Sequence, residues 1–433
     1  MGGRTTAAAA ALLALAAVPV AADPAGAVPA RAATDATGYA FDPAARPLAA
    51  APDPGGAAAL APGRTYRSTL TGRGPVWFRL DLDGTSNAYV SATAVPPADG
   101  EVAASDGVKV SVQDADGHAC SYDTRLFGAS RSPHPVTAWG ARESGVKGRS
   151  VCRDAGTYYV AVERAGRATA TTGTPRPWQL ELTAATEPPL VEAGPTGAPG
   201  DWDSASPTPP AGAPKAREGG AGFAGAPLVG EGAWQTVVRP GQTVYYRVPV
   251  DWGQRLSAAA ELGGTGERRG YAVDALELAL YNPVRAHVAD VGAGYDGTRK
   301  ATALPPLPPV AHRNRYATRD AVAGMRFAGA YYLVVHLSER VADRFGTGPL
   351  PLTLRVGVDG TPGPGPGYAG RPTPGDAFRV ASPGGGGEDG VLRAVAVGGI
   401  GTGTLLLAVL GGWTLLARRR AGQLRASAQN PTA

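Results

Sequence analysis

The sequence predicts an all-β protein made of two tandem jelly-roll or β-sandwich modules, followed by one C-terminal transmembrane helix. Short segments in which apolar and polar residues alternate recur along the chain, each bounded by Gly, Pro or Asp, and such segments are typical of half-buried strands. The whole pattern then occurs a second time. The 62 Gly and 40 Pro among 433 residues leave little helix outside one uncharged run near the C-terminus.

The first module is expected over residues 58–186. In the segment VWFRLDLDG (76–84), the apolar Phe78, Leu80 and Leu82 alternate with polar residues, and an Asp-Gly turn ends the segment. This alternation predicts a strand with one buried face. A series of such short strands predicts an antiparallel sandwich or jelly roll. Similar segments lie at 88–95, 108–117, 157–166 and 178–184.

The second module, expected over residues 226–360, repeats the first. The stretch AGTYYVAVERAG (155–166) returns as AGAYYLVVHLSE (328–339). Arg247 follows Arg79 by 168 positions, and Tyr331 follows Tyr158 by 173. Because the offset stays within a few residues over the whole module, we interpret the two modules as a tandem duplication.

Three segments rich in Pro, Gly or Ala separate these parts of the chain. Residues 23–57 are interpreted as a flexible lead, 187–225 as a linker, and 361–390 as a stalk after the second module. Such composition keeps a chain extended or flexible.

The two ends carry targeting signals. Residues 1–22 place Arg4 before a short apolar run that small residues follow, which is typical of a secretory signal peptide; an uncleaved anchor is the alternative. Residues 391–417 contain a 24-residue run without charge, and about 20 apolar residues span a bilayer. They predict the transmembrane helix, with a buried core helix as the alternative.

Charge after the apolar run indicates the orientation in the membrane. Arginines at 418–420 are expected to stay inside, so that 418–433 form a cytoplasmic tail and the modules lie outside. Within the run, Gly399 and Gly403 form a GxxxG pair that favours close approach of two helices.

The net charge of +5 does not indicate a nucleic-acid partner. Six of the 41 Lys and Arg belong to the terminal segments, which leaves 35 against all 36 Asp and Glu. A nearly neutral ectodomain lacks the basic field that follows phosphates, so a nucleic-acid binder is excluded.

The two cysteines, Cys120 and Cys152, lie on the exported side, where disulfides persist. We expect them to pair; free or metal-binding thiols are the alternative, although no neighbouring Cys or His completes a ligand set. The repeat aligns Cys120 with Val288 and Cys152 with Met325. An apolar pair in the second copy favours a structural disulfide over a redox site.

No catalytic residue and no cofactor is expected. Gly-x-Ser-x-Gly does not occur, since GASRS (128–132) lacks the final Gly, and neither a phosphate-binding loop nor a His-Glu-x-x-His zinc motif is present. His336 aligns with Glu163 and is expected to face outward. The five histidines are scattered singly: His118, His134, His287, His312 and His336.

Two Asp-x-Asp-Gly strings are candidates for calcium. They contain Asp81 with Asp83, and Asp114 with Asp116. The second string lacks the remaining ligands of an EF-hand, and the alternative for both is an Asp-Gly turn that ends a strand. Asp83, Thr85 and Asn87 match a metal-adhesion pattern only in part, because the last position differs.

The segments GVKVSVQDADG and CRDAGTYYVAVER in the first copy, with YYRVPVDWGQRLSAAAEL and GMRFAGAYYLVVHLSERV in the second, resemble the paired C-terminal modules of actinobacterial secreted or membrane proteins that begin with a von Willebrand factor A domain. More loosely, the Gly-x-Tyr-Tyr strand is similar to bacterial pre-peptidase C-terminal domains. The resemblance covers about residues 60–360. Because the A domain itself is absent, its metal-dependent adhesion is not carried over, and the resemblance implies an accessory, non-catalytic surface module.

The sequence therefore favours a membrane-anchored extracellular binding or scaffold protein of the bacterial envelope. The expected partners, besides the membrane, are another envelope protein or a cell-wall polysaccharide. The alternative is a hydrolase on the secreted side, or its accessory subunit, with an unrecognised site. A deep polar pocket or a cluster of perturbed acids would favour that alternative.

Overall fold

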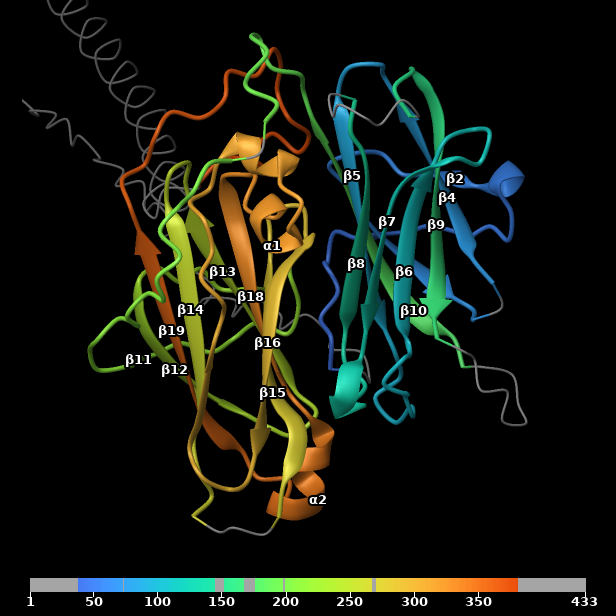
Figure 1. Ribbon diagram of the computed structural model, residues 1–433. Helices are drawn as coiled ribbons and strands as arrows, with labels where there is room; N and C mark the ends of the chain where they lie inside the picture. Colours follow the sequence, from blue (N-terminus) through green and yellow to red (C-terminus); the bar gives the residue numbers. More distant parts are fainter. Residues whose placement is uncertain are drawn as a thin grey trace, which may run out of the picture. The chain divides into compact units, whose positions relative to one another are not determined.

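The alternating segments form strands that pair into four sheets, two for each sandwich (Figure 1). The computed structural model describes residues 38–380, except for 73, 145–151, 167–175, 198 and 267–269. All the described residues belong to one compact unit of the chain. An all-β architecture with tandem sandwiches is therefore confirmed for this range.

The first sandwich is a jelly roll. Its sheets run in the orders β1-β3-β10-β5-β8 and β2-β4-β9-β6-β7. Leaving out the two-residue β1 and β2, successive strands alternate between the two sheets except at the β6–β7 hairpin, which lies within one sheet. This is the strand order of a jelly roll, a double Greek key. The bounds are β1 Arg46–Pro47, β2 Ala58–Ala59, β3 Thr65–Leu70, β4 Val76–Leu82, β5 Asn87–Val95, β6 Gly107–Gln113, β7 Ala119–Leu126, β8 Val136–Arg142, β9 Gly156–Ala165 and β10 Trp178–Glu187.

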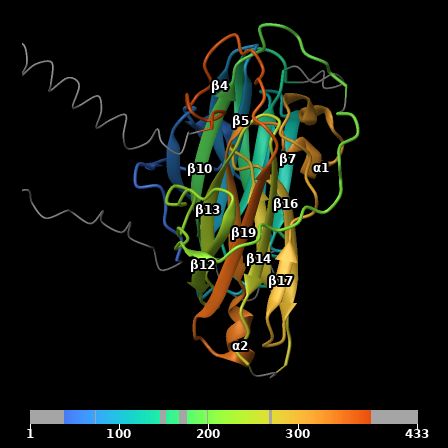
Figure 2. The same cartoon turned by 90° about the vertical axis from the view of Figure 1, so that its left-hand side faces the viewer.

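The second sandwich has the same topology. Its sheets run in the orders β11-β12-β19-β14-β17 and β13-β18-β15-β16, and the first of these sheets faces the viewer in Figure 2. The bounds are β11 Lys215–Ala216, β12 Gly232–Val238, β13 Thr243–Val250, β14 Arg255–Leu262, β15 Ala272–Tyr281, β16 His287–Tyr295, β17 Lys300–Ala303, β18 Gly329–Leu337 and β19 Leu350–Asp359.

The pairing registers match between the copies. Leu80 on β4 pairs with Tyr158 on β9, and Val248 on β13 pairs with Tyr331 on β18. The short β1 runs parallel to β3, as β11 does to β12. Equal offsets in sequence therefore correspond to equal places in the two jelly rolls.

Each sandwich has its own apolar core. Alternate residues of β10, Leu180 and Leu182, are fully buried in the first core. The second core includes Tyr331 and Leu333 of β18, and it also contains Val288 and Met325. Two closed cores mean that each jelly roll buries its inward faces without the other's help.

The segments between and around the sandwiches are more ordered than the sequence suggested. In the part of the expected lead that the structure describes, Tyr39 and Phe41 are buried, and in the expected linker Phe223 is buried. In the expected stalk, Phe378 is buried, and Tyr368 forms a bridge with Leu190. The expectation that these segments are flexible is wrong for these stretches, because their few aromatic residues pack on the sandwiches.

Helix is scarce among the described residues, as expected. No helix among the described residues has the length and apolar character that crossing a membrane requires. The expected signal peptide (1–22), transmembrane helix (391–417) and tail (418–433) lie outside the described residues. The helical turns are η1 Pro54–Gly56, η2 Gly128–Ser130, η3 His312–Tyr316, α1 Asp320–Ala323, η4 Glu339–Val341 and α2 Ala342–Phe345.

Candidate functional site at the junction of the two sandwiches

The outer faces of two sheets, one from each sandwich, are buried against each other. On β5 and β10, Tyr89, Glu181 and Glu187 point away from their own core and are still at most 1% exposed. Tyr245 on β13 and Val334 on β18 lie in one apolar cluster with Val95 of β5. We call this contact the junction.

Three ion pairs cross the junction, each with a glutamate from the first sandwich and an arginine from the second. Arg285 Nη1 lies 2.5 Å from Glu181 Oε1. Arg315 binds both carboxylate oxygens of Glu187, at 2.9 and 2.6 Å. Arg326 Nη1 lies 2.6 Å from Glu143 Oε1. All six side chains are 11% exposed or less.

The arginines come from loops at one end of the second sandwich. Arg315 lies on η3 and Arg326 follows α1. Arg285 sits in the β15–β16 turn with a left-handed backbone (φ 59), where the side chain of Asn282 accepts hydrogen bonds from the backbone of Val284 and Ala286. The local hydrogen bonds therefore hold a backbone conformation that is uncommon for arginine and direct it at the first sandwich.

Glu187 is the most highly connected of the three carboxylates. Besides Arg315, it accepts hydrogen bonds from Asn87, Tyr89 and Tyr368 at 2.8 to 2.9 Å. Burial alone would raise the pKa of Glu187, but the Arg315 guanidinium, the Asn87 amide and nearby His312 lower it to about 2. The carboxylate therefore stays ionised although it is buried.

Two histidines stack across the junction. The rings of His134 and His336 lie 4.3 Å apart. Nδ1 of His336 is 2.9 Å from Thr243 Oγ1, and its Nε2 is 2.9 Å from Ser132 Oγ. Burial lowers the pKa of His134 to about 4. Burial, and after it His134, lower the pKa of His336 well below its ordinary value.

His336 points away from the core of its own sandwich, as its alignment with Glu163 predicted. It is nevertheless buried, with only 3% of it exposed. The first sandwich covers that face, and no pattern within the second copy reveals this.

A group of acids lies at the edge of the same junction. Glu277 on β15 is 3.9 Å from His134 Nε2, and about a third of its side chain is exposed. Burial, and after it the neighbouring Asp290 and Asp274, raise the pKa of Glu277 to about 7. The carboxylate of Asp290 contacts His287, whose Nε2 lies 2.8 Å from Asp290 Oδ1.

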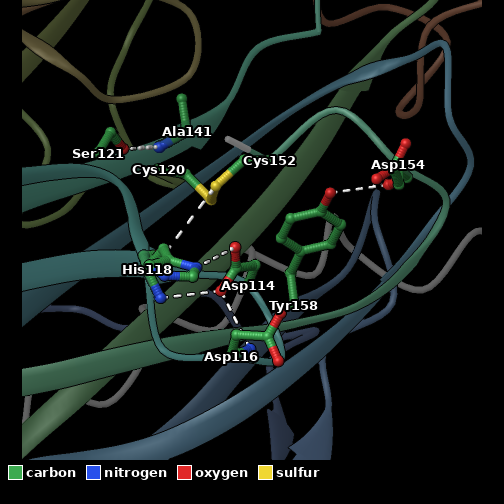
Figure 3. Close-up of a disulfide and its surroundings, with 9 residues drawn as sticks. All are labelled: Asp114, Asp116, His118, Cys120, Ser121, Ala141, Cys152, Asp154 and Tyr158. Atoms are coloured by element: carbon green, nitrogen blue, oxygen red, sulfur yellow. Dashed lines mark hydrogen bonds and ion pairs between the residues drawn. A yellow bond between two sulfur atoms is a disulfide. The ribbon is translucent and has the colours of Figure 1, made fainter. Parts of the chain in front are cut away.

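The cysteines form the predicted disulfide between β7 and the turn before β9 (Figure 3). Near it, Asp114, Asp116 and His118 come together at the β6–β7 turn, with ligand atoms within 4.8 Å of one another. Asp114 accepts hydrogen bonds from the backbone of Asp116 and His118. This geometry is that of a turn closed by its own aspartate.

The other calcium candidates lie apart from this group. Asp81, on β4, accepts a hydrogen bond from Thr157 and lies 3.4 Å from Arg79. Asp83 accepts from the backbone of Thr85 and Ser86, and the pKa of its carboxyl is lowered to about 2, first of all by the Ser86 amide. Both carboxylates are thus satisfied by neighbouring donors.

A cleft opens where the junction reaches the surface. It has a volume of about 430 Å³ and lies between the turn at 63–65, the end of β10, strands β13 and β18, and the segment 374–380. Four arginines line it: Arg64, Arg247, Arg285 and Arg379. Sequence reasoning missed this junction cleft, because its walls come from segments that lie far apart in the chain and carry no shared motif.

Comparisons with known proteins assign no family. No protein-family model and no curated protein matches the chain. Among solved structures, a secreted protein from Eubacterium rectale is 10% identical, covering 76% of this chain and 84% of that one with a TM-score of 0.18. The CBM22-1-CBM22-2 tandem domain of Paenibacillus barcinonensis Xyn10C is 10% identical, covering 69% and 92% with a TM-score of 0.18. The lysozyme inhibitor PliG of Aeromonas hydrophila is 13% identical, covering 31% and 99% with a TM-score of 0.17. These are distant matches, and at such TM-scores none bears on what the chain does.

Proposed function

We propose that this protein is a non-catalytic binding or scaffold ectodomain of the bacterial cell envelope, held to the membrane by the helix expected at 391–417. The observation that carries the proposal is the junction. Three buried Arg–Glu pairs join the two jelly rolls, so that both contribute walls to one open cleft. A ligand bound there contacts two modules whose spacing is already set, which reduces the entropy lost on binding.

The disulfide supports a location outside the cytoplasm. Cys120 and Cys152 are joined, and disulfides of this structural kind persist in oxidising compartments. This agrees with a secretory signal at 1–22 and with an ectodomain that faces outward.

The chemistry of the junction favours binding over turnover. Glu143, Glu181 and Glu187 each have an arginine partner, so their charges are used to hold the sandwiches together. A buried pair of this kind is costly to break, because the remaining charge is left without a counter-ion. Protonation of any of these glutamates would remove its charge and weaken the junction.

The binding function is tested by crosslinking in intact cells. A photoreactive residue at Arg247, on the wall of the junction cleft, is compared with one at Arg344 on α2, which is exposed and lies beyond the other end of β18. We expect capture of an envelope component from Arg247 and not from Arg344. Equal recovery from both positions, or none from Arg247, contradicts the proposal.

Membrane anchoring is tested separately, by extraction of membranes from cells that express the full chain or a chain ending at residue 390. The full chain should resist alkaline carbonate and dissolve in detergent, whereas the shorter chain should be released. Release of both by carbonate contradicts an integral anchor.

A hydrolase is the second candidate, and Glu277 favours it. Its pKa of about 7 suits a general acid, and Nε2 of His134 lies 3.9 Å from its carboxylate. The test is turnover of chromogenic glycoside and ester substrates by the purified protein and by Glu277→Gln. Activity that disappears in the variant would favour the hydrolase over the binding protein.

A further inference from the structure

The junction cleft has the size and shape of a small-ligand site. Its volume of about 430 Å³ falls within the several hundred Å³ typical of such pockets. Its walls come from both sandwiches and from the closing segment 374–380. At Gly329, which starts β18 with a φ of 135, a side chain would meet the Ala377 carbonyl at 2.8 Å, so the closing segment packs directly against bare backbone here.

The charge on its walls is unbalanced. Arg64, Arg247 and Arg379 are exposed, and none of their guanidinium groups has a hydrogen bond or ion pair with another described residue. Arg285, deeper in the wall, already binds Glu181. Asp376 is the only acid among the described residues that line the cleft. A guanidinium binds carboxylate or phosphate oxygens in pairs, so three free ones favour an anion.

Much of the remaining lining is apolar. Pro249, Pro283 and Ala330 form part of the wall, and Tyr332 lies beside them, half-buried. Such a surface suits the C–H face of a sugar ring, as aromatic and apolar walls generally suit the body of a small ligand. A free inorganic anion would leave this surface uncovered.

We propose that the junction cleft binds an anionic saccharide, that is, a sugar unit with carboxylate or phosphate groups in a wall polysaccharide. The proposal deepens the binding function above and rests on it. An acidic peptide would satisfy the same arginines. We favour the saccharide because the cleft is a short pocket of about 430 Å³ limited by strands, the turn at 63–65 and the closing segment, whereas an extended peptide requires a long groove or a free sheet edge.

The test measures binding by calorimetry, with the full-length protein in detergent micelles. Four probes are compared: trigalacturonate for carboxylate, glucose 6-phosphate for phosphate, galactotriose as the neutral control, and a hexaglutamate peptide. We expect one of the two charged sugars to bind and galactotriose to fail, and we expect the affinity to fall as salt is raised. The charged sugar that binds identifies the source of the anion.

Variants locate the site. Arg247→Gln and Arg379→Gln should each weaken binding of the charged sugar about tenfold, since a charge-assisted hydrogen bond contributes about this much, while Arg344→Gln should leave it unchanged. All three residues are exposed, so the thermal midpoint reports whether each variant is folded. Equal binding by Arg247→Gln, equal binding of galactotriose, or preference for hexaglutamate overturns the inference.

The result separates this inference from the function on which it rests. If crosslinking from Arg247 captures an envelope component while no charged sugar binds, the binding function stands and the saccharide is wrong. If neither experiment yields a partner, both proposals fail.

Discussion

At the scale of single residues, the junction shows how a buried carboxylate stays charged. Glu187 is 1% exposed as a side chain, and burial by itself would protonate it. The charge and hydrogen bonds of Arg315, with the hydrogen bond from Asn87 and the nearby His312, reverse that effect. The contribution of the Glu187–Arg315 pair to the free energy of unfolding therefore depends on pH.

Glu187→Gln should lower the free energy of unfolding by about 3 to 5 kcal/mol at pH 7, because Arg315 is left buried without a counter-charge. The pKa of Glu187 is lowered to about 2 in the fold from an ordinary 4.5. A lowered pKa stabilises the fold above about pH 4.5, and this stabilisation is lost as the pH falls towards 2. The gap between wild type and variant should thus narrow below pH 4.5.

Urea unfolding at several pH values measures this gap. Glu163→Gln is the matched control, because Glu163 pairs with Lys109 at a partly exposed site and such a pair contributes less than about 1 kcal/mol. A loss in Glu187→Gln no larger than that of the control would show that the junction pair is not structural.

Glu277 should behave in the opposite way. Burial and its acidic neighbours raise its pKa to about 7, so its contribution is favourable below about pH 4.5 and is lost as the pH rises through 7. Glu277→Gln should therefore stabilise the protein at pH 8, by about 1 kcal/mol after allowance for its partial exposure.

The stabilising effect of Glu277→Gln should vanish at pH 4.5, where the wild-type carboxyl is already neutral. Thermal unfolding at the two pH values measures both effects, with Glu163→Gln, at the partly exposed partner of Lys109, as the comparison. Destabilisation at pH 8 would mean that ionised Glu277 has a favourable partner.

The alternation of residues predicted which side chains point away from the core of their own sandwich, but not what covers those side chains. The alternation in β18 placed His336 outside its own core, and Glu181 on β10 likewise points away from its core. Both are buried, because the opposite sandwich lies there. One signal was present: β5 carries small or apolar residues on both faces, and eight of its nine residues are buried, as expected for a strand covered on both sides.

At the scale of elements, the strands were the most predictable part. Their period of two is a local property that follows from one buried face, and duplication gave each assignment an independent check. The segments rich in Pro and Gly were misjudged for a physical reason. A composition rich in Pro and Gly indicates only that ordering the segment costs conformational entropy. Contacts with residues far away in the sequence offset that cost: Tyr39 contacts Glu181, and Phe378 contacts Phe327.

The disulfide belongs to the same scale, because it ties β7 to the turn before β9 across 32 residues. Cys152→Ser should lower the free energy of unfolding by roughly 3 to 4 kcal/mol, since the unfolded chain regains the entropy of that loop. Amide hydrogen exchange should speed up first in the β6–β7 hairpin of the intact chain. Protection there equal to that of wild type would show that the hairpin holds without the bond.

At the scale of the whole molecule, two jelly rolls with separate cores are joined by an interface that is itself buried. Its apolar parts include Tyr89, Phe327 and Phe378, in a cluster with members from both sandwiches and the closing segment. A polar network of three ion pairs lies beside it. Separating the sandwiches would expose these charges and apolar rings together, so we expect the two to unfold as one unit.

Calorimetry of the wild-type protein should then show a single transition whose calorimetric and van't Hoff enthalpies agree. The triple variant Arg285→Met, Arg315→Met and Arg326→Met leaves three buried glutamates without their arginine partners, which should uncouple the sandwiches and split the transition in two. The control replaces Arg46, Arg344 and Arg371, which are exposed, by Met and should keep one transition. Two transitions in the wild type would mean that each jelly roll unfolds alone, and the junction cleft would then lose the fixed walls on which its proposed affinity depends.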